Sequence, residues 1–232
     1  MAYQRTSEAL KSEVESTSFN IEAYLAQRDK PGQAFTMVEI GHGGVPVVHK
    51  QPHPFTGDRA YIGLETWMRG SKEWVNALIA RRALHDNIFY MHYEPGGEVR
   101  ETRDHGRKEQ WYAGPFDTRS LLPDEAADEV FVSNVFCDPF LAHHGNRTER
   151  LLAEIHRILN PNGVAILRET ITPNDVNEID KDLLEDVGLR VMALETIEDA
   201  DPTRWDQLEA RYNGETINEN ERGSYYLFLA KR

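Results

Sequence analysis

Hydrophobic positions along the 232-residue chain form short apolar runs that alternate with longer stretches of helical periodicity. Apolar runs rich in β-branched and aromatic residues predict strands at 34–41, 60–65, 87–94 and 129–136. Three later runs, VAILRET, LRVMALETI and SYYLFLAKR, predict further strands. Strand–helix alternation is typical of a mostly parallel sheet covered on both faces. We therefore expect a doubly wound α/β fold with seven strands.

The helical stretches have apolar residues at the spacing of one helix face. They predict helices at 67–85, 148–159 and 175–187, the last of which is closed by Gly188 at its C′ position. The first 34 residues are polar and helical in pattern, with Ser18 as an expected N-cap.

Two stretches interrupt this alternation. Residues 96–114 alternate charged and apolar side chains around Asp104-His105-Gly106, which predicts an inserted hairpin. Residues 215–224 read as a loop before the final apolar run. We therefore expect the last strand to enter the sheet antiparallel.

Composition narrows the class of protein. The chain has 26 Lys and Arg against 39 Asp and Glu, a formal net charge of −13, which disfavours a nucleic-acid partner. It has one cysteine, Cys137, and the opening residues lack the apolar core of a secretory signal. No stretch reaches the roughly 18 apolar residues of a membrane span. We expect a cytoplasmic protein with no membrane partner, and a homodimer is compatible with the sequence.

The string VEIGHGGVP, residues 38–46, runs a strand directly into Gly41 and Gly43. Glycine allows positive φ and lets a ligand approach the main chain closely. Ligands of open parallel sheets lie beyond the carboxyl ends of the strands. Glu65 ends the next strand 22 positions after Gly43, where a carboxylate can accept the hydroxyls of a ribose. This spacing suits nicotinamide and adenosyl cofactors equally.

Several motifs decide between these cofactors, because their order resembles that of the class I S-adenosylmethionine-dependent methyltransferases. ERLLAEIHRILNPNGVAILRET is similar to their helix, L-x-P-x-G turn and fifth strand. LPDEAADEVFVSNVF is similar to their fourth strand, and LEDVGLRVMALETI with SYYLFLAKR to their closing hairpin. The resemblance runs from about Ala34 to the C-terminus. It implies a Rossmann-like fold and S-adenosylmethionine as the cofactor.

VEIGHGG, YIGLE and FCDPF are similar to strings of the tRNA guanine-N7 methyltransferases. Those enzymes continue with a basic cluster, whereas this chain continues FLAHHGNRTER. Together with the negative charge, this departure favours a small-molecule substrate. The resemblance implies a cofactor domain at 34–232 and a helical segment at 1–33. That segment is either a lid from which Tyr24 faces the substrate or a plain packing helix.

The same resemblance implies roles for single residues. Gly41 and Gly43 would offer backbone to the cofactor, Glu39 would support that loop or the methionine ammonium, and Glu65 would bind the ribose. Adenine would be held by Asp117 if 96–114 is an insertion, or by Glu94 if the third strand leads directly to the site.

On the acceptor side, Asn134 would lie beside the reactive methyl group and the cofactor. Asp138 or His143 could deprotonate an acceptor within hydrogen-bond distance. Phe140 and His144 would line the substrate pocket. His42, His49 and His53 do not predict a metal site, because Pro52 interrupts the helix that would align them and no acidic or cysteine partner completes a ligand set.

Two other functions fit this sequence. An enzyme of the same fold could cyclise the cofactor's amino-acid chain and release methylthioadenosine, because the odd GHGGVP turn leaves room for a shifted cofactor. A non-catalytic protein could keep the cofactor-binding fold without the chemistry.

Overall fold

The computed structural model describes residues 10, 19–41, 46–65, 87–92, 100–104, 107–111, 122–136, 147–169, 179–212 and 224–232. The predicted helix at 67–85 lies outside these residues. Strands of the main sheet are β1 (Phe35–Ile40), β2 (Arg59–Glu65), β3 (Ile88–His92), β6 (Ala127–Ser133), β7 (Leu159–Glu169), β8 (Leu189–Thr196) and β9 (Tyr225–Lys231).

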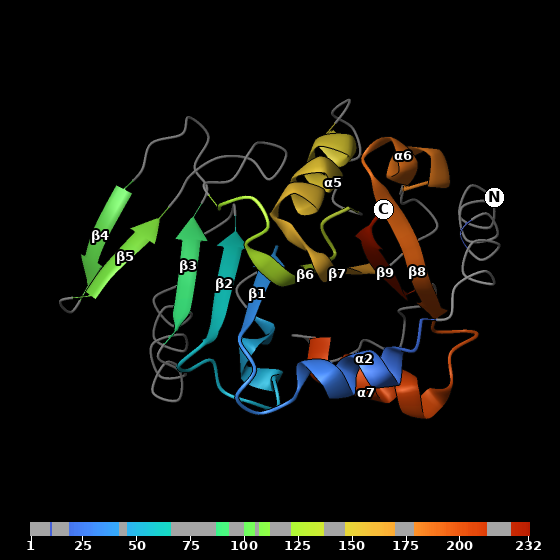
Figure 1. The fold of residues 1–232 in the computed structure, drawn as a ribbon, viewed down its shortest axis with the longest axis horizontal. Helices are drawn as coiled ribbons and strands as arrows, with labels where there is room; N and C mark the ends of the chain where they lie inside the picture. Colours follow the sequence, from blue (N-terminus) through green and yellow to red (C-terminus); the bar gives the residue numbers. More distant parts are fainter. Residues whose placement is uncertain are drawn as a thin grey trace.

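The main sheet of the described residues has the order β3-β2-β1-β6-β7-β9-β8 (Figure 1). The pairs β3–β2, β2–β1, β1–β6 and β6–β7 are parallel. β9 runs antiparallel to both of its neighbours, β7 and β8. The prediction of a mixed, mostly parallel sheet with an antiparallel last strand is therefore confirmed.

Helices cover both faces of this sheet (Figure 1). One face carries α5 (Arg147–Ile158) and α6 (Lys181–Asp186), and the other carries α2 (Ile21–Arg28), α7 (Pro202–Tyr212) and the one-turn 3-10 helix η1 (Val47–Lys50). Strands β1, β6, β7 and β9 alternate their buried side chains between two apolar cores, as a two-sided sheet requires. Under α5 the core includes Val38, Val130, Leu151, Leu152, Ile155 and Leu167; under α2 and α7 it includes Met37, Phe131, Ile166, Leu208, Tyr212 and Phe228.

A two-stranded antiparallel sheet occupies the stretch for which a hairpin was predicted. β4 (Arg100–Asp104) pairs with β5 (Arg107–Trp111), and both lie beyond β3 at the end of the main sheet (Figure 1). This two-stranded sheet therefore extends the β3 side of the molecule and contributes no strand to the main sheet.

Several element boundaries differ from those predicted. Helix α2 is capped by Asn20 rather than Ser18, because the Asn20 side chain accepts a hydrogen bond of 2.8 Å from Ala23 N–H. β6 covers 127–133 instead of 129–136. The expected L-x-P-x-G turn, residues 159–163, lies within β7, and the pairing of β6 with β7 shifts register between Ala127 and Glu129.

Helix α7 is missing from the predicted elements, although its sequence carries a helix signal. Asp201 accepts a hydrogen bond of 3.1 Å from Arg204 N–H and so caps the helix. Trp205, Leu208 and Tyr212 follow at helical spacing and are buried. Trp205 is the one large apolar residue among the nine residues at 198–206. The first turn of the helix therefore lacks the apolar periodicity from which a helix is predicted.

Candidate functional site

The strand order reverses direction between β1 and β6, and the carboxyl ends of these two parallel strands lie side by side (Figure 1). Open α/β sheets bind ligands in the crevice beyond such a point. Gly41 directly follows β1 and Asn134 directly follows β6. The structure thus brings together two residues that the sequence predicted for the cofactor site.

Gly41 has a backbone conformation and surroundings that exclude a side chain. Its φ is +78°, and its N–H donates a hydrogen bond of 2.9 Å to the carbonyl of Leu64 in β2. A Cβ at Gly41 would lie 2.1 Å from Cγ2 of Val135 and 3.6 Å from the carbonyl oxygen of Ser133. The ends of β1, β2 and β6 therefore meet at bare glycine backbone.

Glu39 fixes the segment that follows the glycine-rich loop. Its side chain is buried at the end of β1, accepts a hydrogen bond of 2.9 Å from Val47 N–H and also accepts one from the Tyr61 hydroxyl. The same segment is anchored to α7, because Gln51 Nε2 donates to the Arg211 carbonyl at 3.0 Å. Two roles were expected for Glu39, support of the loop and binding of the methionine ammonium. The observed contacts fit support of the loop.

Asn134 begins a tight turn after β6. Its φ is +52°, its side chain is exposed, and its N–H donates a hydrogen bond of 2.8 Å to the carbonyl of Arg168. The next two amides, of Val135 and Phe136, both donate to Oε1 of Glu169 at 3.2 Å. Sequence reasoning missed Glu169, although a carboxylate at the end of a predicted strand was a usable signal.

Glu65 is the last residue of β2, in register with His92 of β3. Its neighbour Leu64 accepts the Gly41 amide, so Glu65 stands at the same edge of the sheet as Gly41. The remaining predicted site residues lie outside the described part of the chain: Gly43, Glu94, Asp117, Asp138, Phe140, His143 and His144.

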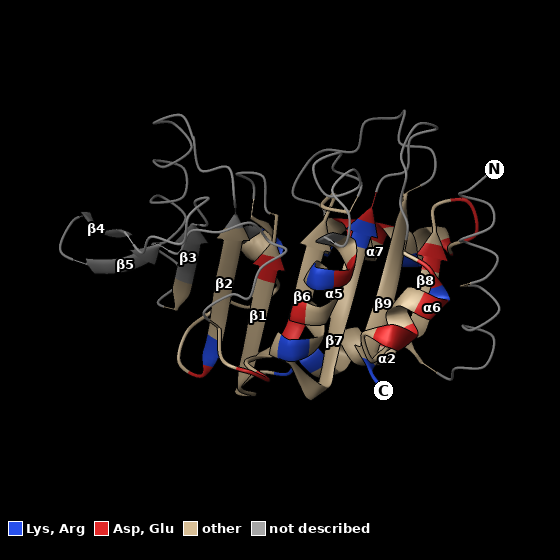
Figure 2. Ribbon diagram, turned by 90° about the horizontal axis from the view of Figure 1, so that it is seen from above, with Lys and Arg blue, Asp and Glu red and all other residues tan. Residues whose placement is uncertain are grey.

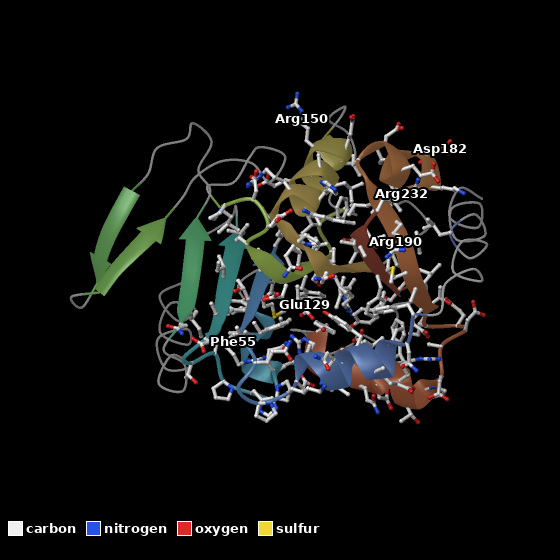
Figure 3. All side chains as sticks on the ribbon, in the orientation of Figure 1. Phe55, Glu129, Arg150, Asp182, Arg190 and Arg232 are labelled. Atoms are coloured by element: carbon white, nitrogen blue, oxygen red, sulfur yellow. The ribbon has the colours of Figure 1, made fainter. Side chains whose placement is uncertain are left out.

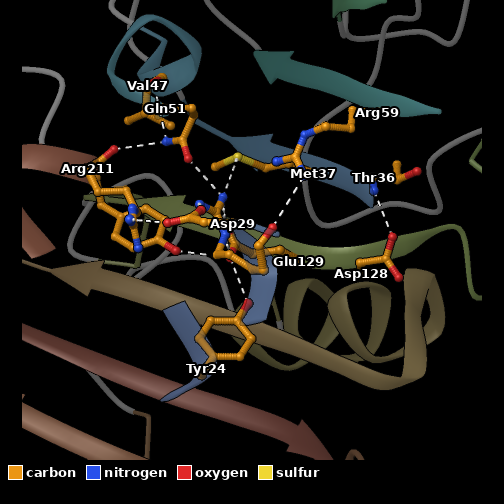
Figure 4. A network of polar contacts seen from close by, with 12 residues as sticks. Tyr24, Asp29, Thr36, Met37, Val47, Gln51, Arg59, Asp128, Glu129 and Arg211 are labelled. Atoms are coloured by element: carbon orange, nitrogen blue, oxygen red, sulfur yellow. Dashed lines mark hydrogen bonds and ion pairs between the residues drawn. The ribbon is translucent and has the colours of Figure 1, made fainter. Parts of the chain in front are cut away.

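Tyr24 lies elsewhere, at the face of the sheet rather than beyond the strand ends. Its hydroxyl donates a hydrogen bond of 2.7 Å to Oε2 of Glu129, which belongs to the amino-terminal half of β6 (Figure 4). Burial of apolar Ile21 and Leu25 beside it draws α2 onto the sheet. The expected substrate-facing position of Tyr24 is therefore not seen, because its ring and hydroxyl belong to an internal network.

Glu129 is the centre of that network. Figure 3 shows Glu129 between the sheet and α2, whereas Arg150 extends outward from α5. Besides Tyr24, Glu129 accepts hydrogen bonds from Arg28 Nη2 at 2.9 Å and from the Tyr212 hydroxyl at 3.0 Å. Arg28 also donates to Gln51 Oε1 at 2.8 Å. One buried carboxylate thus ties α2, α7 and the segment after η1 to β6.

Burial sets the titration of the two tyrosines in this network. It raises the pKa of Tyr24 and of Tyr212 well above the ordinary value, and the neighbouring Glu129 charge raises both further. For Arg28, burial acts to lower the pKa, but the Glu129 carboxylate together with the neighbouring Tyr212, Tyr24 and Asp29 raises it overall. The network therefore holds neutral tyrosines around the buried ion pair of Arg28 and Glu129.

These raised tyrosine pKa values predict a loss of stability in alkali. An unfolded chain ionises tyrosine at about pH 10, while the folded protein keeps both protons. The contribution is thus fully present below about pH 10 and is lost as the pH rises toward the folded pKa. We expect thermal melts of Tyr24→Phe/Tyr212→Phe to fall less steeply with alkaline pH than those of the wild type. Equal slopes would contradict this assignment.

An open groove of about 430 Å³ lies between α2, α7 and the segment after η1. Its lining residues are Glu22, Leu25, Ala26, Asp29, Lys50, Pro52, Gln207, Ala210 and Arg211. Asp29 and Arg211 already form an ion pair of 2.5 Å with each other. The groove is separate from the strand ends that hold Gly41 and Asn134.

The described residues contain no group of three or more His, Cys, Asp or Glu residues that could hold a metal ion. None of the helices within them is long and apolar enough to cross a membrane.

Comparison with known proteins gives structural matches only. No protein-family model matches the chain, and no curated protein sequence matches it. A TehB-like SAM-dependent methyltransferase from Corynebacterium glutamicum matches with a TM-score of 0.50 and 14% identity, over 99% of this chain and 98% of its own. The methyltransferase CalH, in complex with SAH (S-adenosylhomocysteine), has a TM-score of 0.54 and 13% identity, over 90% of this chain and 54% of its own.

The [4+2]-cyclase SpnF also matches, with a TM-score of 0.51 and 13% identity, over 90% of this chain and 78% of its own. At such low sequence identities the matches show the fold alone. They agree with the observed strand order and with the glycine bend after β1. The chain therefore has the Rossmann-like α/β fold of the class I S-adenosylmethionine-dependent methyltransferases.

Proposed function

We propose that this protein is an S-adenosylmethionine-dependent methyltransferase that acts on a small molecule by in-line methyl transfer. The observation that carries the proposal is the bare backbone of Gly41 at the switch point, where a Cβ would lie 2.1 Å from Val135. Glycine there serves close packing of three strand ends and leaves main chain facing the crevice.

We assign the cofactor contacts to four residues. Gly41 and Gly43 offer backbone, and Glu65 accepts hydrogen bonds from both ribose hydroxyls. Asp117 holds the adenine. Glu39 supports this surface from beneath, because it binds the amide of Val47 after the loop.

S-adenosylmethionine, when bound, supplies a methyl group already activated on a positively charged sulfur. The protein's main task is therefore alignment, which can contribute up to about 7–11 kcal/mol to lowering a barrier. Asn134 directly follows β6, at the switch point of the strand order, and it is exposed. Asp138 or His143 takes the proton of the acceptor, while Phe140 and His144 line its pocket.

Charge supports a small acceptor over a nucleic acid. Figure 2 shows acidic and basic positions mixed along α5, the helix that follows the acceptor-side segment. Arg157 of this helix is neutralised by Glu154 at 2.7 Å and Asp124 at 2.5 Å. With a net charge of −13, the chain repels a phosphate backbone. We expect the enzyme in the cytoplasm.

Calorimetry of S-adenosylmethionine binding tests the cofactor assignment through Glu65→Ala. A hydrogen bond to a charged group contributes about 1.5–3 kcal/mol, so we expect at least tenfold weaker binding, which is about 1.4 kcal/mol. Asp58→Ala is the matched control, since Asp58 is an exposed carboxylate just before the amino end of the same strand. Equal affinity of the Glu65 variant and the wild type would remove the ribose role.

A cyclase that consumes the cofactor is the second candidate. The observation that favours it is the shortness of η1, a single 3-10 turn of four residues where a longer helix would restrict the ligand. Chromatography of the spent cofactor separates the two reactions. S-adenosylhomocysteine supports methyl transfer, and methylthioadenosine supports cyclisation.

A further inference from the structure

We propose that Glu169 is a positioning residue for the active site, which it serves by holding the turn Asn134–Phe136 in place. This inference rests on the proposed function, because it gives that turn its importance. Glu169 ends β7, next to β6 in the sheet, and its side chain is fully buried.

One oxygen of Glu169 holds two successive amides. Val135 N–H and Phe136 N–H both donate to Oε1 at 3.2 Å. A third bond from the same edge, Asn134 N–H to the Arg168 carbonyl at 2.8 Å, fixes the start of the turn. Successive amides that point at one acceptor define the path of the backbone, so the carboxylate dictates how the chain leaves β6.

The fixed turn has consequences on both sides of the crevice. Asn134 is held at φ +52°, a conformation that asparagine tolerates better than most residues, and this sets the direction of its exposed side chain. Val135 packs against Gly41 so closely that no Cβ fits between them. A shift of the turn would therefore move both the acceptor-side Asn134 and the wall behind the cofactor-side glycine.

The test compares Glu169→Gln with Glu169→Ala in the full-length protein. Glutamine keeps a carbonyl oxygen that can accept both amides, whereas alanine removes the acceptor. Glu154→Ala is the control, because Glu154 is also a largely buried carboxylate, but it pairs with Arg157 on α5. Two readouts are used, amide hydrogen exchange of Val135 and Phe136 by NMR and S-adenosylhomocysteine affinity by calorimetry.

We expect Glu169→Ala to speed exchange of these two amides, and to weaken S-adenosylhomocysteine binding, each by about tenfold. Glu169→Gln should stay within about threefold of wild type in both readouts, and Glu154→Ala should change neither. Two results together would show that Glu169 has a purely structural role. Glu169→Ala would speed amide exchange throughout β6 and β7, and it would weaken S-adenosylhomocysteine binding no more than Glu154→Ala does. These results would overturn the inference.

Two further outcomes distinguish a failure of the Glu169 role from a failure of the proposed methyltransferase function. If wild type and Glu169→Ala bind S-adenosylhomocysteine equally well, Glu169 does not position the site and the proposed function stands. If the wild type binds none, the proposed cofactor is wrong. The exchange rates of Val135 and Phe136 then decide alone whether Glu169 holds the turn.

Discussion

Glu129→Ala should lower the free energy of unfolding by about 3–5 kcal/mol, because it removes the fully buried carboxylate that pairs with the Arg28 guanidinium and leaves only the more exposed Asp29 beside it. Two tyrosine hydroxyls, those of Tyr24 and Tyr212, lose their acceptor in the same variant. The loss falls on the packing of α2 and α7 against β6, not on the strand ends. Chemical denaturation measures it, and the midpoint should fall while the fold remains.

The double variant Arg28→Met/Glu129→Leu separates two costs to stability, that of leaving a buried charge unpaired and that of losing the contacts of the Glu129 side chain. Replacing a whole buried ion pair by apolar side chains is often nearly neutral, so this variant should be clearly more stable than Glu129→Ala. Lys181→Ala is a surface control, because Lys181 and Glu185 form an exposed pair at 3.7 Å that should matter little. If Glu129→Ala lowers the free energy of unfolding by less than about 1 kcal/mol, the contacts of Glu129 stabilise the fold no more than a surface ion pair does.

Gly41→Ala is the second large effect that we expect, and it arises from two separate costs. A left-handed backbone conformation costs a residue with a Cβ about 1–2 kcal/mol. Overpacking against Val135, 2.1 Å from the new Cβ, adds typically about 1–3 kcal/mol. The summed loss of stability, about 2–5 kcal/mol, should come with weaker S-adenosylmethionine binding, because the shift occurs at the proposed cofactor surface.

Gly32→Ala isolates the backbone cost. Gly32 has nearly the same φ, +74°, but nothing lies within 4 Å of a Cβ there. Denaturation of the two variants should therefore differ by the packing term alone, and Gly32→Ala should keep cofactor affinity. Adding Val135→Ala to Gly41→Ala should recover part of the difference. If Gly32→Ala and Gly41→Ala cost the same, the close approach to Val135 has no energetic weight.

Hydrophobic periodicity predicted the buried parallel strands and the strongly one-sided helix α5, but not helix α7. Strands such as 34–41 and 60–65 were readable because buried parallel strands are continuous apolar runs. Helix α5 was readable because Leu151, Leu152 and Ile155 fall on one face. Helix α7 was missed, because its first turn is polar and its three buried anchors include Trp205 and Tyr212, which also suit strands.

The candidate site divides in the same way. The sequence by itself determined the α/β alternation, the strand that runs into Gly41, and the acidic residue that ends the next strand, because these depend on neighbours along the chain. Only the tertiary structure decided that Glu169 holds the turn after β6, that Glu39 binds the Val47 amide, and that Tyr24 turns to Glu129 on the face of the sheet. Tyr24 and Glu129 are 105 residues apart, and no local pattern encodes which buried hydroxyl will meet which buried carboxylate. Such pairings arise when the helices pack and each buried polar group must find a partner.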